Sequence, residues 1–213
     1  MLQSLLDAAR PLLAPAFTAW GVPMTWLEIV AFLVSLWMVG CEMRVHVLAW
    51  PLAAVSSLLY ALLFADSRLY GEASLQLFFV AMAAWGGWQW LRGRSGGGAL
   101  VVHRLPARAR WTLLAATLLA WPATAALLHR FTDSDVPWLD ALPTVGSVAG
   151  TWLLGRKFIE NWPVWIAVNA FSVGLFAYKH LWLTVILYAL FAALSCAGWR
   201  AWQRLQGRVD AAR

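Results

Sequence analysis

The sequence predicts an all-α polytopic membrane protein with seven transmembrane helices, arranged as two parallel three-helix repeats joined by a linker helix. Composition is the first reason. Hydrophobic residues fill 62% of the 213 positions and charged residues only 12%, too few charges to cover a soluble domain of this size. Apolar stretches of about 20 residues recur, the length that an α-helix needs to cross a bilayer. The third reason is an internal repeat.

Residues 1–23 are expected to form an amphipathic segment at the membrane surface. They carry an apolar stripe that Pro11 and Pro15 interrupt, and they lack the basic start of a signal peptide. A short additional span is the alternative, and it would reverse the location of the N-terminus.

Seven apolar segments follow and are expected to span the membrane. They cover residues 24–41, 47–64, 71–91, 111–129, 137–155, 162–178 and 182–202. The domain organisation that follows is a first repeat (24–91), a basic loop (92–110), a linker helix (111–129), a second repeat (137–202) and a tail (203–213).

The distribution of basic residues predicts the orientation. The loop 92–110 holds five arginines and no acid, and the tail "RAWQRLQGR" is also basic. Since cytoplasmic loops carry the excess of Lys and Arg, both are expected in the cytoplasm, with the C-terminus inside and the N-terminus outside. The high pI therefore reflects membrane topology, and we expect no nucleic-acid partner.

The internal repeat appears when the chain is aligned with itself so that the "WP" at Trp50 meets the "WP" at Trp162. Without a gap, 15 of the 65 aligned positions in 26–90 and 138–202 are identical. The matches include the pairs Gly86–Gly198 and Trp90–Trp202. The competing explanation is that apolar helices resemble one another by composition. Three spans reverse the direction of the chain across the membrane and the linker helix restores it, so the two repeats are parallel. Transporters use this architecture.

Candidate binding residues are those that differ between the repeats deep inside the spans. Ala53 corresponds to Trp165, Ser57 to Asn169 and Gln76 to Tyr188. An unpaired amide in lipid is costly, so Asn169 and Gln76 must face protein or a water-filled cavity. Hydrogen bonding between helices is the alternative, and we favour it for Ser57, Thr184 and Ser195. Most of the 16 tryptophans lie at span ends, as an interfacial belt requires, but Trp37, Trp121, Trp152 and Trp165 lie deeper.

The acidic residues and the remaining motifs narrow the function. Every acid in or next to a span lies at the end of that span. Because ion-coupled carriers commonly need a buried carboxylate, we expect an uncoupled facilitator. The histidines and cysteines have no metal-ligand spacing, and no nucleophile elbow is present. We therefore expect no metal, no cofactor and no enzyme activity. Gly146 and Gly150 predict a close helix contact.

Two long motifs give the chain a family resemblance. "RLYGEASLQLFFVAMAAWGGWQW" from Arg68 and "ENWPVWIAVNAFSVGLFAYKHLWLTVILYALFAALSCAGWRAW" from Glu160 resemble the Pnu family of bacterial vitamin transporters, and the resemblance extends over about 24–202. It implies a three-one-three arrangement like that of the SWEET sugar transporters, in the bacterial inner membrane. It also implies facilitated diffusion, driven by a cytoplasmic kinase that phosphorylates the vitamin. The binding residues it implies are Trp162, Trp165, Asn169, Gln76 and Tyr188.

The expected substrate is nicotinamide riboside, whose cationic ring suits a tryptophan cage by cation–π attraction. Asn169 and Gln76 would pair with its carboxamide or its hydroxyls. Thiamine would satisfy the same cage. A SWEET-like sugar carrier and a membrane scaffold without a ligand are the other functions that stay open, as does homo-oligomer formation.

Overall fold

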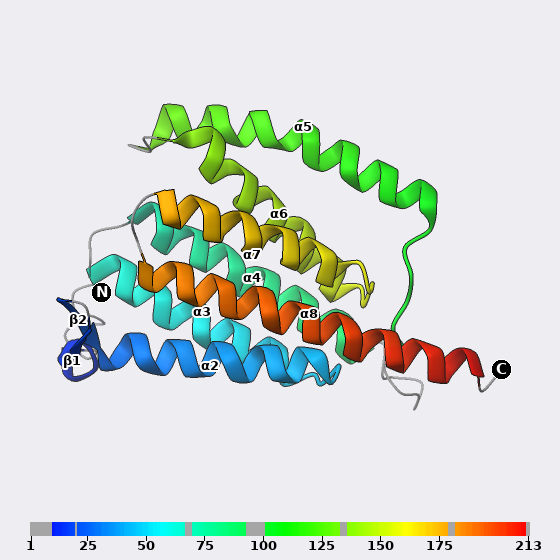
Figure 1. Ribbon diagram of the computed structural model, residues 1–213, viewed down its shortest axis with the longest axis horizontal. Helices are drawn as coiled ribbons and strands as arrows, with labels where there is room; N and C mark the ends of the chain where they lie inside the picture. The colour runs from blue at the N-terminus through cyan, green and yellow to red at the C-terminus, as the bar shows by residue number, and fades with distance from the viewer. Residues whose placement is uncertain are drawn as a thin grey trace. The chain divides into compact units, whose positions relative to one another are not determined.

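The structure is a computed structural model, and it describes residues 10–19, 21–66, 70–92, 101–132, 136–178 and 182–211. The chain divides into two compact units, Met1–Leu91 and Arg92–Arg213. Figure 1 shows both, coloured from blue at the N-terminus to red at the C-terminus. Each unit is built mainly from long α-helices.

In the described part of the first unit, residues 10–13 are helical and a β-hairpin follows. Strand β1 (Pro15–Ala19) pairs antiparallel with β2 (Val22–Thr25), and an irregularity between Pro15 and Phe17 shifts the register. Gly21 lies in the turn with φ of +80°, a conformation that glycine adopts without steric cost.

The hairpin corrects one sequence expectation, since the chain is predominantly helical rather than all-α. Its strands overlap the end of the segment 1–23, whose amphipathic character stays a prediction. Residues 10–13, which include Pro11, are helical, and the helix ends before Pro15 because proline lacks the amide N–H and clashes with the preceding turn. Residues 1–9 lie outside the described part, and a surface location of 1–23 stays a prediction.

Three helices complete the first unit: α2 (Trp26–Met43), α3 (Ala49–Asp66) and α4 (Tyr70–Arg92). Thr25 caps α2, since its Oγ1 accepts a hydrogen bond of 3.2 Å from the amide of Glu28. Helices α2 and α3 meet at a buried pair of hydroxyls, with Ser35 Oγ 2.7 Å from Ser56 Oγ. Such a pair satisfies both polar groups inside an apolar interface.

The second unit contains α5 (Ala107–Phe131), α6 (Pro137–Gly155), α7 (Asn161–Tyr178) and α8 (Trp182–Ala211). Each of these helices packs against the next one in the chain. The largest differences from the expected boundaries are that α5 begins inside the predicted loop 92–110 and that α8 continues through the predicted tail 203–213 as far as Ala211. The polar residues there favour helix as well as apolar ones do.

The ends of the helices repeat along the chain at the offset found in the sequence. Four pairs of helix ends fall at equivalent positions of the repeat. The starts that match are those of α3 and α7 (Ala49 and Asn161) and of α4 and α8 (Tyr70 and Trp182). The ends that match are those of α2 and α6 (Met43 and Gly155) and of α3 and α7 (Asp66 and Tyr178). Equivalent sequence therefore starts and stops equivalent helices in the two units.

The turns after α2 and α6 also match. Val45 (φ 52°) and Lys157 (φ 60°) are the non-glycine residues of the described chain with positive φ, and they occupy equivalent positions of the repeat. The amide of Val45 donates to Glu42 O (3.0 Å) and that of Lys157 to Leu154 O (2.9 Å). The same hydrogen-bonded turn therefore forms from two different sequences.

Four helices of the described chain are long and apolar enough to cross a membrane, judged by length and composition: Trp26–Met43, Ala49–Asp66, Ala107–Phe131 and Val185–Gln206. The other three long helices carry more tryptophan, glycine, proline and amide residues. Seven spans remain the prediction from the sequence.

Candidate functional site

Trp162 begins the candidate site at the first turn of α7. Its indole is 1% exposed and lies across Gly198 of α8, where an added Cβ would overlap the ring. Trp202 meets the same indole edge to face, with ring centroids 5.6 Å apart and planes at 86°. Trp162 is therefore a fully packed side chain at the junction of α7 and α8.

The first unit contains the same arrangement. Trp50 lies across Gly86, and Trp90 meets it edge to face at 5.5 Å and 84°. Within the described structure, the indole N–H groups of both Trp50 and Trp162 are buried without a hydrogen-bond partner. A position with the same packing in both units has a structural role, so direct substrate contact by Trp162 stays a prediction with that role beside it.

Trp165 lies one turn further along α7 and has a different environment. Its indole is half-exposed and rests on Gly150 of α6, with Cε2 and Nε1 3.0 and 3.1 Å from where a Cβ would stand. Val168 makes a similar close contact with Gly146. The close helix contact expected from these two glycines is confirmed, and it gives one indole face a support of bare backbone.

Trp165 is also distinguished from the other tryptophans that the sequence placed deep in the spans. Trp121 donates to the carbonyl of Trp138 at 2.8 Å. Trp152 packs against Phe158, and Trp37 is 60% exposed on α2. In the described chain no residue hydrogen-bonds the half-exposed indole of Trp165, which leaves its N–H available to a ligand.

Asn169 follows Trp165 by one helical turn and is 5% exposed. Its Nδ2 donates to Ser195 Oγ of α8 at 3.3 Å, and that hydroxyl donates to the carbonyl of Phe191 at 2.8 Å. The described residues supply no partner for the other amide atom, Asn169 Oδ1. The helix-bridging role expected for Ser195 is confirmed, and the bridge holds one end of the amide while its carbonyl stays free to accept. The side chain of Thr184, for which the same role is expected, lies outside the described part.

Tyr188 belongs to an aromatic cluster on the same pair of helices. Its ring lies 5.0 Å from Phe176 of α7, tilted by 31°, and it meets Phe191 edge to face at 6.3 Å. The sequence singled out Tyr188 but not Phe191, whose apolar type is common in any buried helix. Three levels of contact therefore join α7 and α8, at Trp162, Asn169 and Phe176.

Gln76 belongs to the first unit. It lies on α4 and is half-buried. None of the described residues hydrogen-bonds its side chain. An amide in this position still needs a partner if it is to be stable away from water.

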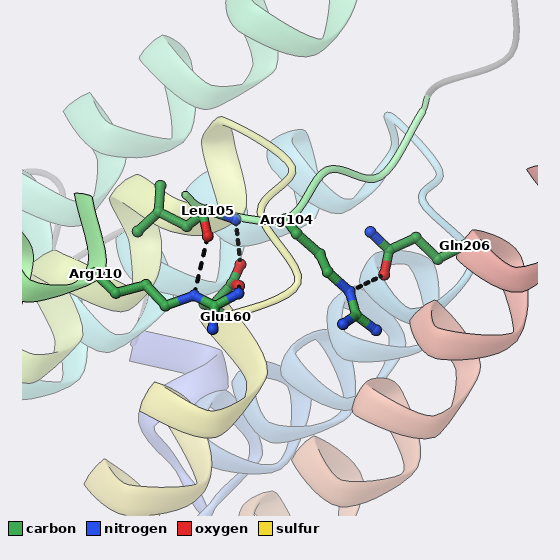
Figure 2. A network of polar contacts seen from close by, with 5 residues as sticks. All are labelled: Arg104, Leu105, Arg110, Glu160 and Gln206. Atoms are coloured by element: carbon green, nitrogen blue, oxygen red, sulfur yellow. Dashed lines mark hydrogen bonds and ion pairs between the residues drawn. The ribbon is translucent and has the colours of Figure 1, made fainter. Parts of the chain in front are cut away.

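The predicted basic loop makes a polar network that the sequence did not reveal (Figure 2). Glu160, in the turn before α7, accepts a hydrogen bond of 3.0 Å from the amide of Leu105 and pairs with Arg110 at 2.9 Å. Arg110 Nε donates to the carbonyl of Leu105, and Arg104 Nε donates to Gln206 of α8, both at 2.9 Å. The only sequence signal was an acid at a span end facing a loop of arginines.

Acidic groups are absent from the middle of the described helices, because every Asp and Glu there lies in a first or last turn; this includes Glu42, which is buried at the end of α2. The described residues also contain no cluster of His, Cys, Asp and Glu that could hold a metal. The polar groups available around α7 and α8 are thus amides, hydroxyls and indole N–H groups. These suit a neutral or cationic organic molecule with hydrogen-bonding groups.

A groove of about 490 Å³ lies elsewhere in the second unit. Its walls are the first turns of α5, the residues Leu105 and Pro106 just before that helix, and Trp152 near the end of α6. The five predicted binding residues do not line it.

Known proteins resemble this chain along most of its length. A family model described as nicotinamide mononucleotide transporter matches residues 25–204. The nicotinamide riboside transporter PnuC of Escherichia coli (strain K12) is 22% identical over 209 residues, which cover 86% of this chain and 87% of that protein. The riboflavin/roseoflavin transporter RibM of Streptomyces davaonensis is 27% identical over 198 residues, or 92% of each chain.

A solved structure shares the fold. The crystal structure of the vitamin B3 transporter PnuC matches with a TM-score of 0.71 and 24% sequence identity. The match covers 86% of this chain and 83% of that chain.

Proposed function

The chain belongs to the nicotinamide mononucleotide transporter (Pnu) family, and we propose that it carries nicotinamide riboside across the membrane by facilitated diffusion. As a member of this family it is a multi-pass transporter of the bacterial inner membrane and not an enzyme. The substrate, the mechanism and the binding residues are the parts that we propose.

The observation that carries the proposal is the arrangement of Trp165 and Asn169 on one face of α7. An indole supported by Gly150 presents its face and its free N–H, and one turn away Asn169 presents an acceptor. A pyridinium ring stacked on the indole gains cation–π attraction of about 2 kcal/mol when it is desolvated. The carboxamide and the ribose hydroxyls provide donors for Asn169 Oδ1.

The other predicted residues have supporting roles. Tyr188 would close the aromatic wall with Phe176, and Trp162 would fix the start of α7. Gln76 stays a predicted member of the site because its amide has no partner among the described residues.

The mechanism we propose is uncoupled transport. The acidic residues of the described helices all lie near helix ends. No carboxylate in the middle of these helices could therefore bind a driving proton or sodium ion. Net uptake would then follow the concentration gradient, which a cytoplasmic kinase maintains by phosphorylating the riboside. The proposed architecture is seven spans as parallel three-one-three repeats, SWEET-like, with the C-terminus in the cytoplasm.

Uptake of labelled nicotinamide riboside into proteoliposomes tests the site. We expect Trp165→Ala to raise KM about thirtyfold, from the lost cation–π contact of about 2 kcal/mol. Asn169→Ala should raise it about tenfold, from one lost hydrogen bond. Trp37→Ala is the matched control, because it removes an exposed indole from α2. A KM unchanged in both site variants would refute the assignment.

Riboflavin is the second candidate substrate, because RibM is a relative over 92% of the chain. The isoalloxazine ring of riboflavin is uncharged, so it would stack on Trp165 without the cation–π contribution. Tryptophan-fluorescence titration with nicotinamide riboside, riboflavin, thiamine and a sugar separates these ligands. Saturable quenching by riboflavin or thiamine alone would keep the family and change the substrate.

A further inference from the structure

The groove beside α5 combines an apolar floor with a basic mouth. Ala109, Leu113 and Ala116 line it along two turns of α5, since residues at these spacings share one face of a helix. Trp152 of α6 forms the opposite wall. The two alanines leave space beside the helix that larger side chains would fill.

The polar atoms near the floor are already satisfied within the protein. The hydroxyl of Thr112 donates to the carbonyl of Arg108 at 3.0 Å. The amide and the carbonyl of Leu105 bond to Glu160 and Arg110. The groove therefore offers hydrocarbon contacts along its length, which suits an acyl chain better than a polar metabolite.

One arginine lines the groove, and a second contacts the tryptophan that forms its wall. Arg108 lines the groove directly, and the guanidinium of Arg156 lies 5.8 Å from the ring of Trp152. In the described part of the chain neither one is paired with a carboxylate, because Glu160 is already engaged by Arg110. The mouth thus carries uncompensated positive charge.

The mouth lies beside the start of an apolar helix, where lipid headgroups are expected. Arg108 is in the first turn of α5, and Trp111 beside it is 71% exposed, as interfacial tryptophans are. The body of α5 is apolar enough to cross a bilayer. A lipid with its headgroup at Arg108 would therefore run its chain along α5 in the direction of the groove.

We propose that this groove binds one acidic phospholipid of the surrounding bilayer. Its phosphate lies between Arg108 and Arg156, and one acyl chain occupies the space between α5 and Trp152. Basic pockets between transmembrane helices hold acidic lipid headgroups in this way. The volume of about 490 Å³ lies within the range of about 300–1,000 Å³ typical of small-ligand sites.

Native mass spectrometry of the detergent-purified protein tests the proposal, with dioleoyl-phosphatidylglycerol and dioleoyl-phosphatidylcholine as probes. We expect phosphatidylglycerol, which carries a net negative charge, to bind more tightly than phosphatidylcholine. Each of Arg108→Gln and Arg156→Gln should weaken it about fivefold, and the double variant about 25-fold. Arg130→Gln is the matched control, since it removes the same charge from the other end of α5. Equal affinity for the two lipids, or an equal loss in the control, would overturn the proposal.

Two further arms separate a groove lipid from a surface anion. Ala116→Phe fills the groove without changing charge, so it should weaken phosphatidylglycerol binding while Arg108 is intact. Phosphatidylglycerol should also raise the unfolding temperature of the protein, and inorganic phosphate should not. Unchanged lipid binding in Ala116→Phe, or equal stabilisation by phosphate, would show that no acyl chain lies beside α5.

Discussion

At the scale of single residues, one contact recurs in both units: an indole lying across a glycine. Trp50 on Gly86 and Trp162 on Gly198 are both held edge to face by a second, buried tryptophan. Because neither indole has space to move, the glycine hydrogen is the only group that fits beneath it. This explains why tryptophan, glycine and tryptophan match at these positions of the repeat.

Adding one methyl group under either indole should therefore destabilise the fold. We expect Gly86→Ala and Gly198→Ala each to cost about 3 kcal/mol, the upper end for overpacking. That exceeds the gain of about 1 kcal/mol from replacing a helical glycine by alanine. Gly40→Ala and Gly174→Ala are matched controls, because nothing lies within 4 Å of the added Cβ, and they should be neutral or stabilising. Thermal unfolding in detergent measures all four; equal effects would contradict the contact.

The left-handed residue Lys157 offers the opposite test, since glycine should stabilise its turn. Positive φ costs a residue with a Cβ about 1–2 kcal/mol, and the freer unfolded chain of a glycine variant offsets about 0.5–1 kcal/mol of that gain. Lys157 is partly exposed, so we expect Lys157→Gly to gain about 0.5–1 kcal/mol in thermal unfolding. Val45 has a positive φ too but is only 8% exposed, so Val45→Gly should lose stability, because removing a buried side chain costs more than the turn gains. Val47→Gly, at a position without positive φ, is the control and should also lose stability; a loss of stability in Lys157→Gly would argue against its φ value.

At the scale of elements, the stretch before α5 (residues 102–105) is attached to the turn between α6 and α7. The side chains of Val102 and Leu105 are buried, and His103 forms a parallel bridge with Phe158. Glu160 completes the attachment through the amide of Leu105 and the guanidinium of Arg110. The start of the linker helix is thus fixed to the turn between α6 and α7 by backbone and side-chain contacts together.

Removing Glu160 should release this stretch. Glu160→Ala leaves the buried amide of Leu105 without its acceptor and should cost about 1–3 kcal/mol. Arg104→Ala removes an exposed hydrogen bond to Gln206 and should cost no more than about 0.5 kcal/mol. Thermal unfolding and limited proteolysis after residue 100 would report both. Equal protease sensitivity of the two variants would contradict the special role of Glu160.

At the scale of the whole molecule, a repeated scaffold carries polar groups that are not repeated. The helix ends, the turns and the tryptophan–glycine contacts match between the units, but the buried polar pairs do not. The first unit has Ser35 and Ser56 between α2 and α3, whereas the second has Asn169 and Ser195 between α7 and α8. The substrate that we propose is itself asymmetric, and its recognition would require unequal polar groups on an equal frame.

The proposed uncoupled mechanism makes a prediction for the complete transporter. Uptake of nicotinamide riboside into proteoliposomes should stop at equal concentrations inside and outside. Ionophores that dissipate proton and sodium gradients should leave its rate unchanged, because no mid-helix carboxylate is present among the described residues to bind either ion. Enclosing a riboside kinase with ATP should convert equilibration into accumulation. Accumulation driven by an ion gradient alone would refute the mechanism.

The sequence by itself determined the family, the number and approximate ends of the long helices, and the offset of the internal repeat. These follow from local properties: apolar length, proline and glycine positions, and side-chain type, each of which acts over a few neighbouring residues. It also predicted Trp165 and Asn169 as binding residues, because both differ from their repeat mates deep inside a span, and that assignment stays a prediction.

Only the tertiary structure decided which side chains meet. It showed that Trp162 is packed on Gly198, that Trp165 rests on Gly150, and that Asn169 bonds to Ser195. It also showed the hairpin at 15–25 and the role of Glu160. The physical reason is that these contacts join residues far apart in the chain, and their partners depend on how helices pack, which no local pattern encodes.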